Sequence, residues 1–445
     1  MEIKRDIMEA LLQWKNRQQR KPLIIQGARQ IGKTWVMKKF GEAHYQHVAY
    51  FNFDASEELC REFENTKDPE RLIGILRLYT DQPIEPEKTL IIFDEIQQSN
   101  KALNSLKYFC EDAPQYHIMA AGSLLGVSLS QGDSFPVGKV EFLCMYPVTF
   151  REFLCSDDPR MYEYLEALTA IAPLPEIVIG KLTESWRRYQ VCGGMPAAAT
   201  ALLANQGTEE VERRQREILT AYSLDFAKHA PAKDIPRIAA IWNSIPSQLA
   251  KENRKFLYKL VKSGARAREY EDSLLWLQHA GLVYRVFCSS KPGLPLSAYD
   301  DVSAFKIYLC DAGLLRAMAQ LPTEVLWSDN PLYTEFKGAM TENQILQSLI
   351  SQFEVMPRYW TSEGTAEVDF LLQHAASLSP VEVKSGMSLK GKSLSVYIRQ
   401  YNPEIALRYS MNNLRKDGMI LNIPLFLADW TQKLLMLLQA NESDS

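Results

Sequence analysis

Eight consecutive residues near the N-terminus combine two glycines with a lysine and a threonine. The stretch from Gly27 to Thr34 reads GARQIGKT and fills every fixed position of the pattern G-x-x-x-x-G-K-[ST]. Glycines let the backbone turn its N–H groups toward an anion, and a helix that follows adds the positive end of its dipole. Lys33 is then expected to reach the β and γ phosphates, and the Thr34 hydroxyl to ligate Mg²⁺. The pattern therefore predicts a loop that holds a triphosphate.

The elements needed to position this loop are present on both sides of it. Residues 23–26 form a short apolar run that is typical of a buried parallel strand, and the amphipathic segment WVMKKFGE begins a helix. A chance Gly-rich turn is the alternative, and the strand–loop–helix context argues against it. The residues predicted to contact ATP are Gly27, Ala28, Arg29, Gln30, Ile31, Gly32, Lys33, Thr34 and Trp35.

A second apolar run, residues 89–93, leads directly into Asp94 and Glu95. Ligands of open α/β sheets bind at the C-terminal ends of the strands, so Asp94 is predicted to hold Mg²⁺ and Glu95 to polarise the attacking water. Acids that are merely solvated at a strand end are the alternative. The strand predicted at residues 117–121 is followed by Ser123, a candidate sensor of the γ phosphate, although Gly-Ser is also an ordinary turn.

The C-terminal region carries a second set of acids with a lysine. Glu342 lies in a predicted helix, Asp369 on a predicted strand, and Glu382 and Lys384 on the next strand. Because side chains alternate along a strand, Glu382 and Lys384 share one face, and Asp369 can lie beside Glu382 if the strands pair. Asp369 and Glu382 would hold Mg²⁺, Lys384 would orient water or stabilise developing charge, and Glu342 would complete the site. Exposed acid–base alternation on an amphipathic strand is the alternative.

Several segments together resemble one known family. GARQIGKT, LIIFDEIQ, AAGSLLG and MYPVTFREFL are similar to the ATPase core of prokaryotic AAA+-type proteins that carry a C-terminal region with a restriction-endonuclease-like domain. The D…E-x-K arrangement resembles that nuclease fold, including Holliday-junction resolvases. The family commonly has Gly-Arg-Val before MYPVTF, whereas this chain has Lys139 at the arginine position. A lysine lacks the bidentate fork of an arginine finger, so the resemblance does not extend to a finger here.

The region between these two parts contains a cluster of basic residues. Helices are predicted from about residue 235 to Gly281, followed by two strands near 283–287 and 305–309, which is a winged-helix pattern. A basic strip on such elements predicts binding of a DNA backbone, and a solvated face or one that docks on acidic surface is the alternative. The basic residues are Lys251, Arg254, Lys255, Lys259, Lys262, Arg266 and Arg268.

Composition limits the remaining possibilities. The chain has 445 residues with a formal net charge of −4, which argues against coating nucleic acid by bulk charge. Its seven cysteines form no C-x-x-C pair, so buried thiols in a reducing compartment are expected. The first residues read as a charged amphipathic helix rather than a signal peptide, and no apolar run approaches about 18 residues. We expect a cytoplasmic protein without a membrane segment, and an oligomer is compatible with the sequence.

These features define a multidomain α/β protein. We predict an AAA+-like P-loop domain with a parallel sheet flanked by helices over residues 1–155, and a helical linker or lid over 156–232. A winged-helix-like module would span 233–325, and an α/β nuclease-like domain 326–445. The predicted function is Mg²⁺-dependent ATP hydrolysis coupled to DNA binding, with nuclease activity left open. The alternative is an ATP-dependent switch or scaffold for protein partners, with an inactive nuclease-like docking domain.

Overall fold

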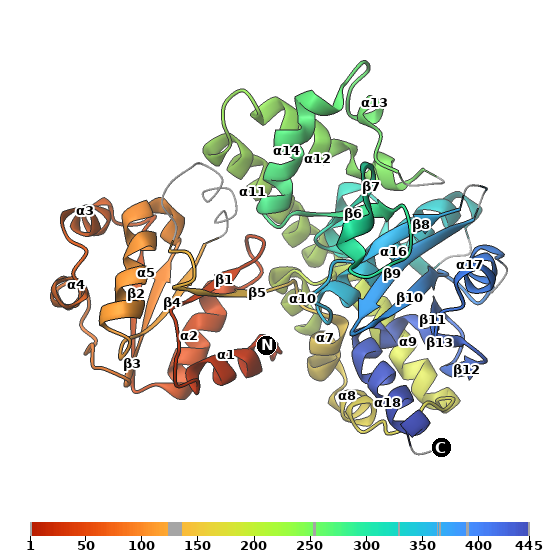
Figure 1. Ribbon diagram of the computed structural model, residues 1–445, viewed down its shortest axis with the longest axis horizontal. Coiled ribbons are helices and arrows are strands. Elements are labelled where there is room, and N and C mark those ends of the chain that lie inside the picture. Colours follow the sequence, from red (N-terminus) through yellow and green to blue (C-terminus); the bar gives the residue numbers. More distant parts are fainter. Residues whose placement is uncertain are drawn as a thin grey trace. The chain divides into compact units, whose positions relative to one another are not determined.

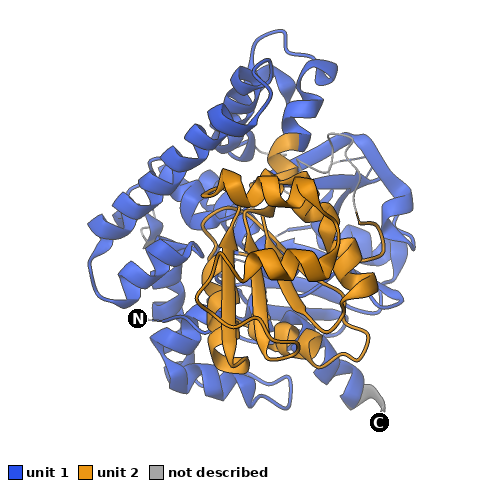
Figure 2. Ribbon diagram, turned by 90° about the vertical axis from the view of Figure 1, so that its left-hand side faces the viewer, with its two compact units in different colours: residues 1–4, 147–275, 283–445 blue, residues 5–146, 276–282 orange. Residues whose placement is uncertain are grey.

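The protein divides into two compact units in its computed structural model. The structure describes residues 2–122, 136–251, 255–327, 330–362, 364, 366–388 and 391–443. The small unit comprises residues 5–146 and 276–282, and the large unit comprises residues 1–4, 147–275 and 283–445 (Figure 2).

A five-stranded sheet forms the centre of the small unit (Figure 1). Its strands have the order β2-β3-β4-β1-β5, and every pairing between neighbours is parallel. β3 and β4 are buried along their whole length, in keeping with their mostly apolar sequences. The predicted parallel sheet with flanking helices is thereby confirmed. The strand bounds are Leu23–Gln26 (β1), His47–Asn52 (β2), Thr89–Asp94 (β3), His117–Ala121 (β4) and Glu141–Cys144 (β5).

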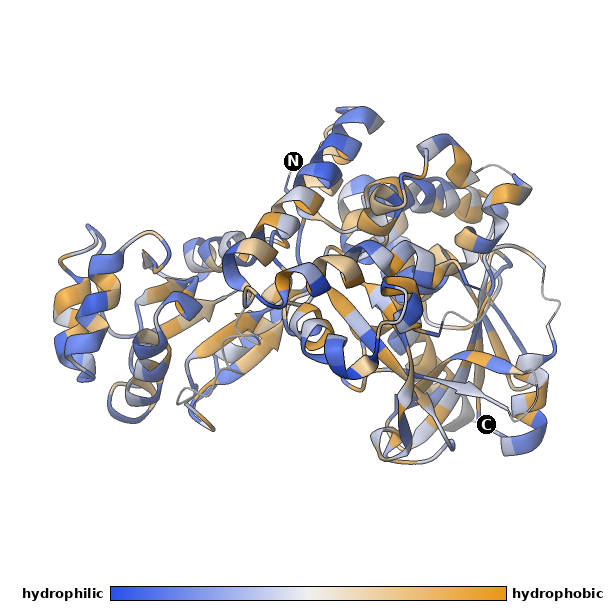
Figure 3. Cartoon of the chain, turned by 90° about the horizontal axis from the view of Figure 1, so that it is seen from above, coloured by the Kyte–Doolittle hydropathy of each residue, from blue (hydrophilic) through white to orange (hydrophobic). Residues whose placement is uncertain are grey.

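Helices cover the sheet of the small unit and bury their apolar sides against it. Their residues alternate between hydrophobic and polar around each helix, whereas the strands are mainly hydrophobic (Figure 3). Phe53, Phe63 and Phe93 meet edge to face with ring centroids 5.3–5.7 Å apart, a favourable geometry for packed aromatic rings. The bounds are Ile7–Lys15 (α1), Lys33–His44 (α2), Glu57–Asn65 (α3), Pro69–Leu76 (α4), Ile96–Gln98 (η1) and Asn100–Asp112 (α5).

The first part of the large unit is helical, as predicted. A tight turn separates α9 from α10, where Gly193 has a φ of 64° and a Cβ on it would lie 2.7 Å from the backbone nitrogen of Gly313. Only glycine fits this turn without strain. The helices here are Phe150–Asp157 (α7), Pro159–Glu166 (α8), Glu176–Cys192 (α9), Pro196–Leu203 (α10), Thr208–His229 (α11), Ile235–Leu249 (α12), Tyr258–Val261 (α13) and Ala267–His279 (α14), whose last residues belong to the small unit.

An eight-stranded mixed sheet forms the second part of the large unit, in the order β12-β13-β11-β10-β9-β8-β6-β7. The predicted hairpin is present as β6 and β7, but it is also one edge of this sheet, because β6 pairs in parallel with β8. A winged-helix module therefore stays a prediction. The bounds are Val283–Ser289 (β6), Asp300–Leu309 (β7), Arg358–Thr361 (β8), Glu367–His374 (β9), Ser377–Val383 (β10), Ala406–Ser410 (β11), Arg415–Asp417 (β12) and Ile420–Pro424 (β13).

The remaining described helices belong to the same part of the chain as this sheet. The longest of them, α16, contacts both β7 and β10. Their bounds are Leu296–Tyr299 (η2), Ala312–Met318 (α15), Thr323–Trp327 (η3), Pro331–Tyr333 (η4), Thr334–Ile350 (α16), Ser393–Tyr401 (α17), Leu425–Trp430 (η5) and Thr431–Ser443 (α18).

Candidate functional site

The predicted phosphate loop connects the end of β1 to the first residue of α2. Gly27 has a φ of 146° and Gly32 a φ of 95°, values that side-chain-bearing residues rarely adopt. A Cβ on Gly27 would lie 2.2 Å from the backbone oxygen of Met145, so only glycine fits there. Because α2 begins at Lys33, its unpaired N–H groups and dipole point toward the loop. The loop thus has the geometry of an anion-binding helix N-terminus.

Lys33 is the one basic side chain that the pattern fixes, and it is 8% exposed. Its Nζ donates to the backbone oxygens of Gly27 and Ala28, each at 2.8 Å. Burial is the main cause that lowers the pKa of Lys33 to about 8, and the nearby charges of Glu95 and Asp94 oppose this shift. The ammonium group is therefore held over the loop, where an incoming phosphate would replace the two carbonyl oxygens as its partner.

Two hydroxyl groups converge on Asp94 at the end of β3. Thr34 Oγ1 donates to Asp94 Oδ2 at 2.7 Å, and Tyr50 OH, from β2, donates to the same oxygen at 2.8 Å. Donation by Thr34 leaves the lone pairs of its oxygen available to a cation. Hydroxyl and carboxylate oxygens are the ligands that Mg²⁺ prefers, so Thr34 and Asp94 fit the metal predicted for this site. The two motifs lie 60 residues apart in the sequence, and the hydrogen bond brings their side chains together.

Glu95 follows β3 in a left-handed backbone conformation with φ 50° and ψ 41°. This conformation is costly for a residue other than glycine, and such outliers cluster at functional sites. Gln97 Nε2 donates to Glu95 Oε2 at 2.5 Å. The carboxylate is thereby held by a side chain of its own turn.

The other residues predicted for the nucleotide site lie in different environments within the small unit. Ser123 lies outside the described residues. Ile31 is fully buried, Gln30 has a φ of 63°, and Trp35 is 37% exposed beside Thr34. Lys139 forms an ion pair with Glu111, with 2.8 Å between Nζ and Oε1. A role for Lys139 as a finger is thus not supported by its position in this structure.

The sequence did not identify three neighbours of the loop. Arg5 donates to the backbone oxygens of Ile31 at 2.9 Å and Tyr146 at 2.7 Å, and it is 5% exposed. Gly281, in the segment 276–282 of the same unit, approaches so closely that a Cβ would lie 3.0 Å from the Ala28 nitrogen. Tyr50, at Asp94, is the third. Only Tyr50 had a sequence signal, since it is a polar residue near the end of the strand beside β3.

The predicted acids and lysine of the C-terminal region are distributed over neighbouring strands of the large sheet. Glu382, on β10, is 3% exposed and forms two ion pairs, with Lys384 Nζ at 3.2 Å and Arg408 Nε at 3.0 Å. Arg408 lies on β11 directly across from Glu382 in the parallel register. Asp369, on β9, uses Oδ2 to accept the backbone N–H of Val383 at 2.7 Å. The structure thus joins Glu382 to Lys384 and adds an arginine that the sequence did not predict.

Glu342 has a different set of partners. Its Oε2 accepts a hydrogen bond from Tyr308 OH, on β7, at 3.2 Å. Lys306, also on β7, forms an ion pair with Glu367, with 2.5 Å between Nζ and Oε1. Within the described ranges, no three His, Cys, Asp or Glu side chains are arranged to hold a metal. Both oxygens of Glu382 are already in ion pairs, so a divalent cation fits poorly there without displacing Arg408 or Lys384.

The predicted basic surface is present on and around α13 and α14. Lys259, Lys262, Arg266 and Arg268 are exposed, as is Lys251. Among the residues that the structure describes, Lys259, Lys262, Arg266 and Arg268 form no ion pair. Lys255 is half-buried, and Arg254 lies outside the described residues.

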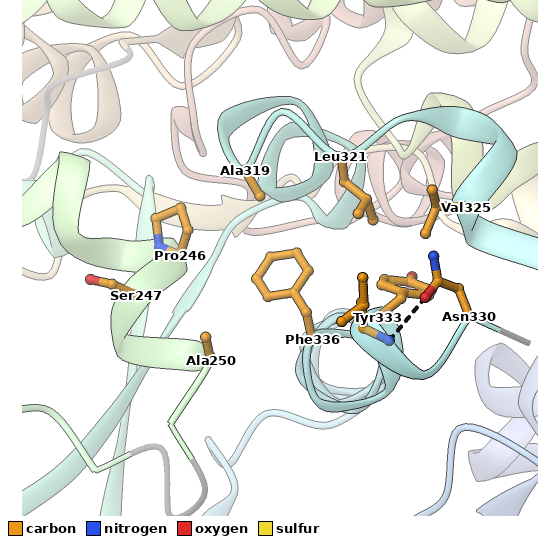
Figure 4. Close-up of a pocket in the computed structure, with 10 residues that line it drawn as sticks. Pro246, Ser247, Ala250, Ala319, Leu321, Val325, Asn330, Tyr333 and Phe336 are labelled. Carbon is orange, nitrogen blue, oxygen red and sulfur yellow. Dashed lines mark hydrogen bonds between the residues drawn. The ribbon is translucent and has the colours of Figure 1, made fainter. Parts of the chain in front are cut away.

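A pocket of about 490 Å³ opens elsewhere in the large unit, beside the end of α12 (Figure 4). Its walls are mainly apolar, with Pro246, Leu321, Val325 and Phe336 among them. Asn330 accepts a backbone N–H from Leu332 at 2.9 Å, and no lysine or arginine is among the described residues that line the pocket. The described lining thus offers a phosphate group no cation, whereas the loop carries Lys33.

Comparison with known proteins agrees with the geometry of the small unit. A family described as an AAA domain matches residues 19–154. This N-terminal domain is an AAA-type P-loop ATPase domain. Two further families match residues 183–325 and 337–426, and both are described only as domains of unknown function. No curated protein matches the chain. Among the described residues, no helix has the length and apolar character needed to cross a membrane.

Comparison with solved structures gives matches of low sequence identity. A Walker-type ATPase of Pyrococcus abyssi is 12% identical with a TM-score of 0.42, and the match covers 72% of this chain and 96% of that one. A RuvB of Thermotoga maritima is 13% identical with a TM-score of 0.32, covering 64% and 90%. An ORC1 protein of Aeropyrum pernix, solved in complex with DNA, is 14% identical with a TM-score of 0.28, covering 72% and 91%.

Proposed function

We propose that this AAA-type ATPase hydrolyses ATP with Mg²⁺ at the loop between β1 and α2. The observation that carries the proposal is the hydrogen bond from Thr34 Oγ1 to Asp94 Oδ2 at 2.7 Å, beside the buried Lys33. It brings the hydroxyl of one motif and the carboxylate of another to a single point, where oxygen ligands and a positive charge are both required.

Each residue of the site has a defined task in this proposal. Lys33 exchanges its carbonyl partners for the β and γ phosphates, while the loop N–H groups and the dipole of α2 bind the same oxygens. Thr34 and Asp94 would hold Mg²⁺, which when bound would neutralise charge on the phosphates. Glu95 leaves Gln97 and accepts a hydrogen bond from the attacking water, which orients it toward the γ phosphate. Ser123 remains our candidate for sensing that phosphate.

ATP turnover by wild type and Lys33→Ala, with Mg²⁺ and with EDTA, tests the proposal. Wild-type turnover should require Mg²⁺, and Lys33→Ala should abolish it because the only pattern-fixed cation at the phosphates is gone. Turnover that is equal in the two proteins would refute the assigned site. Adding DNA to the same assay shows whether the ATPase responds to nucleic acid.

We further propose that the basic surface around α13 and α14 binds a DNA backbone. Four exposed cations that form no ion pair within the described part of the chain support this reading, because ion-paired cations would have little charge left for phosphates. They are Lys259, Lys262, Arg266 and Arg268. Cleavage of that DNA by Asp369, Glu382, Lys384 and Glu342 stays a prediction. Mg²⁺-dependent cleavage that Asp369→Ala or Lys384→Ala abolishes would support it.

A switch that acts on protein partners is the second candidate function, and Arg408 favours it. The guanidinium group occupies one side of Glu382, where a nuclease of this kind would need a cation ligand free. A buried Glu382 on β10 that pairs with Lys384, directly after β10, and with Arg408 on β11 is suited to holding these two strands together. This reading expects no cleavage of any DNA with Mg²⁺ or Mn²⁺, and cleavage by the wild type would exclude it.

A further inference from the structure

Asp94 receives a hydroxyl group that the phosphate-loop pattern does not supply. Tyr50 OH donates to Asp94 Oδ2 at 2.8 Å, the oxygen that also accepts from Thr34. Tyr50 lies on β2, whose register pairs it with Ile92, two residues before Asp94. The tyrosine therefore reaches along the strand pair to the acid at the C-terminal end of β3.

The hydroxyl groups of Thr34 and Tyr50 are expected to respond differently when nucleotide binds. Thr34 is on the loop, and its oxygen is a proposed ligand of Mg²⁺, so its contacts change with the nucleotide. Tyr50 belongs to a sheet strand and has no such second task. The other oxygen, Asp94 Oδ1, accepts the Glu95 N–H at 3.2 Å, so both ends of the carboxylate are held by the protein. Tyr50 thus fixes the rotation of the carboxylate by a bond that need not break.

The surroundings of Tyr50 keep its hydroxyl group a donor. A phenol hydroxyl is protonated at neutral pH, so Tyr50 donates to the carboxylate of Asp94. Lys38 Nζ lies 3.6 Å from the centroid of the Tyr50 ring, a cation–π contact that draws electron density from the phenol. A more polarised O–H group makes a stronger hydrogen bond to a carboxylate.

We propose that Tyr50 is a positioning residue that orients Asp94 for Mg²⁺ and so sets the affinity of the site for the metal–nucleotide complex. The proposal rests on the proposed ATP site but makes a separate claim. ATP without metal is held by the loop and Lys33, whereas the contribution of Mg²⁺ depends on Asp94. Loss of the Tyr50 hydroxyl should therefore weaken binding only when Mg²⁺ is present.

The test compares Tyr50→Phe with Tyr45→Phe in the full chain. Tyr45 is the matched control, because its hydroxyl also makes a partly buried hydrogen bond in the same unit, to His117 Nδ1 at 2.6 Å. We measure the Kd for ATP in Mg²⁺ and in EDTA. Tyr50→Phe should weaken binding about tenfold in Mg²⁺ and less than about twofold in EDTA. Tyr45→Phe should change neither value.

A kinetic measurement separates positioning from catalysis. The Mg²⁺ concentration at half-maximal turnover should rise about tenfold in Tyr50→Phe, with kcat nearly unchanged. Equal weakening in Mg²⁺ and EDTA would overturn the proposal, as would no weakening in Mg²⁺. If Tyr50→Phe does not fold, Lys38→Met leaves the hydroxyl in place and should give the same Mg²⁺-specific loss at about threefold. If wild type neither binds nor hydrolyses ATP, the proposed function fails, which the wild-type control shows separately.

Discussion

The lowered pKa of Lys33 makes ATP affinity depend on pH in a direction that the structure fixes. Burial lowers the pKa of Lys33 to about 8, below the ordinary lysine value of 10.5. Phosphate oxygens in contact with Nζ stabilise the ammonium form, so the pKa must rise when ATP binds. Affinity is then fully present below about pH 8 and is lost as the pH rises through that value.

The magnitude follows from the fraction of Lys33 that carries its proton before binding. That fraction is about nine-tenths at pH 7 and about one-tenth at pH 9, so the Kd for ATP should rise about tenfold between them. The phosphates themselves are already ionised over this range, because their last pKa is near 6. Titrations of ATP into the protein at fixed Mg²⁺ and ionic strength, at half-unit steps of pH, measure the effect.

Lys33→Arg is the control for this prediction, since a guanidinium keeps its charge throughout the range. Its Kd for ATP, whatever its absolute value, should vary less than about twofold from pH 7 to 9. A wild-type Kd that is constant over this interval would refute the reasoning. So would an equal pH dependence in Lys33→Arg, because another group would then be titrating.

Three further perturbations have outcomes that the structure predicts. Gly27→Ala should weaken ATP binding by about tenfold or more, because its Cβ would meet a backbone oxygen at 2.2 Å. Gly180→Ala is the control, because this exposed glycine lies in a helix with open space around it. This variant should bind ATP normally and gain about 1 kcal/mol of stability. Asp311→Ala should lower the free energy of unfolding in urea by roughly 2–5 kcal/mol, because the buried carboxylate accepts two backbone N–H groups, at 2.6 and 2.8 Å, that would lose their partner. Replacing Lys259 and Lys262 with Gln should reduce the slope of log affinity for DNA against log salt by about 2, and an unchanged slope would place the DNA elsewhere or nowhere.

Local sequence was enough to predict the phosphate loop and the strand that ends at Asp94. In both cases the reactive side chains lie next to the residues that set the backbone conformation. A glycine spacing or an apolar run therefore predicts them. The parallel sheet followed from the same runs, because the carboxyl ends of parallel strands gather ligands at one edge. The two motifs assign Thr34 and Asp94 to one Mg²⁺ site; their hydrogen bond agrees with this assignment, which stays a prediction.

Contacts that depend on tertiary packing could not be read in the same way. Arg5 precedes the loop in the sequence and Gly281 lies far after it, and neither belongs to a pattern that predicts the contact. Arg408 meets Glu382 only because β11 lies beside β10 in a particular register. The same sheet includes the hairpin β6–β7, because β8, about 70 residues later, pairs with β6. Strand order and register are global properties, and local residue patterns do not specify them.

The central claim is that Glu95 activates the water at an ATP site, and Glu95→Gln tests it most directly. The substitution keeps the size of the side chain and removes its negative charge, and with it the ability to accept a proton. Turnover measured at saturating Mg²⁺ and ATP should fall by about 100-fold or more, while the Kd for ATP stays within about twofold of wild type. Turnover by Glu95→Gln equal to that of wild type, with ATP bound equally well, would contradict the account.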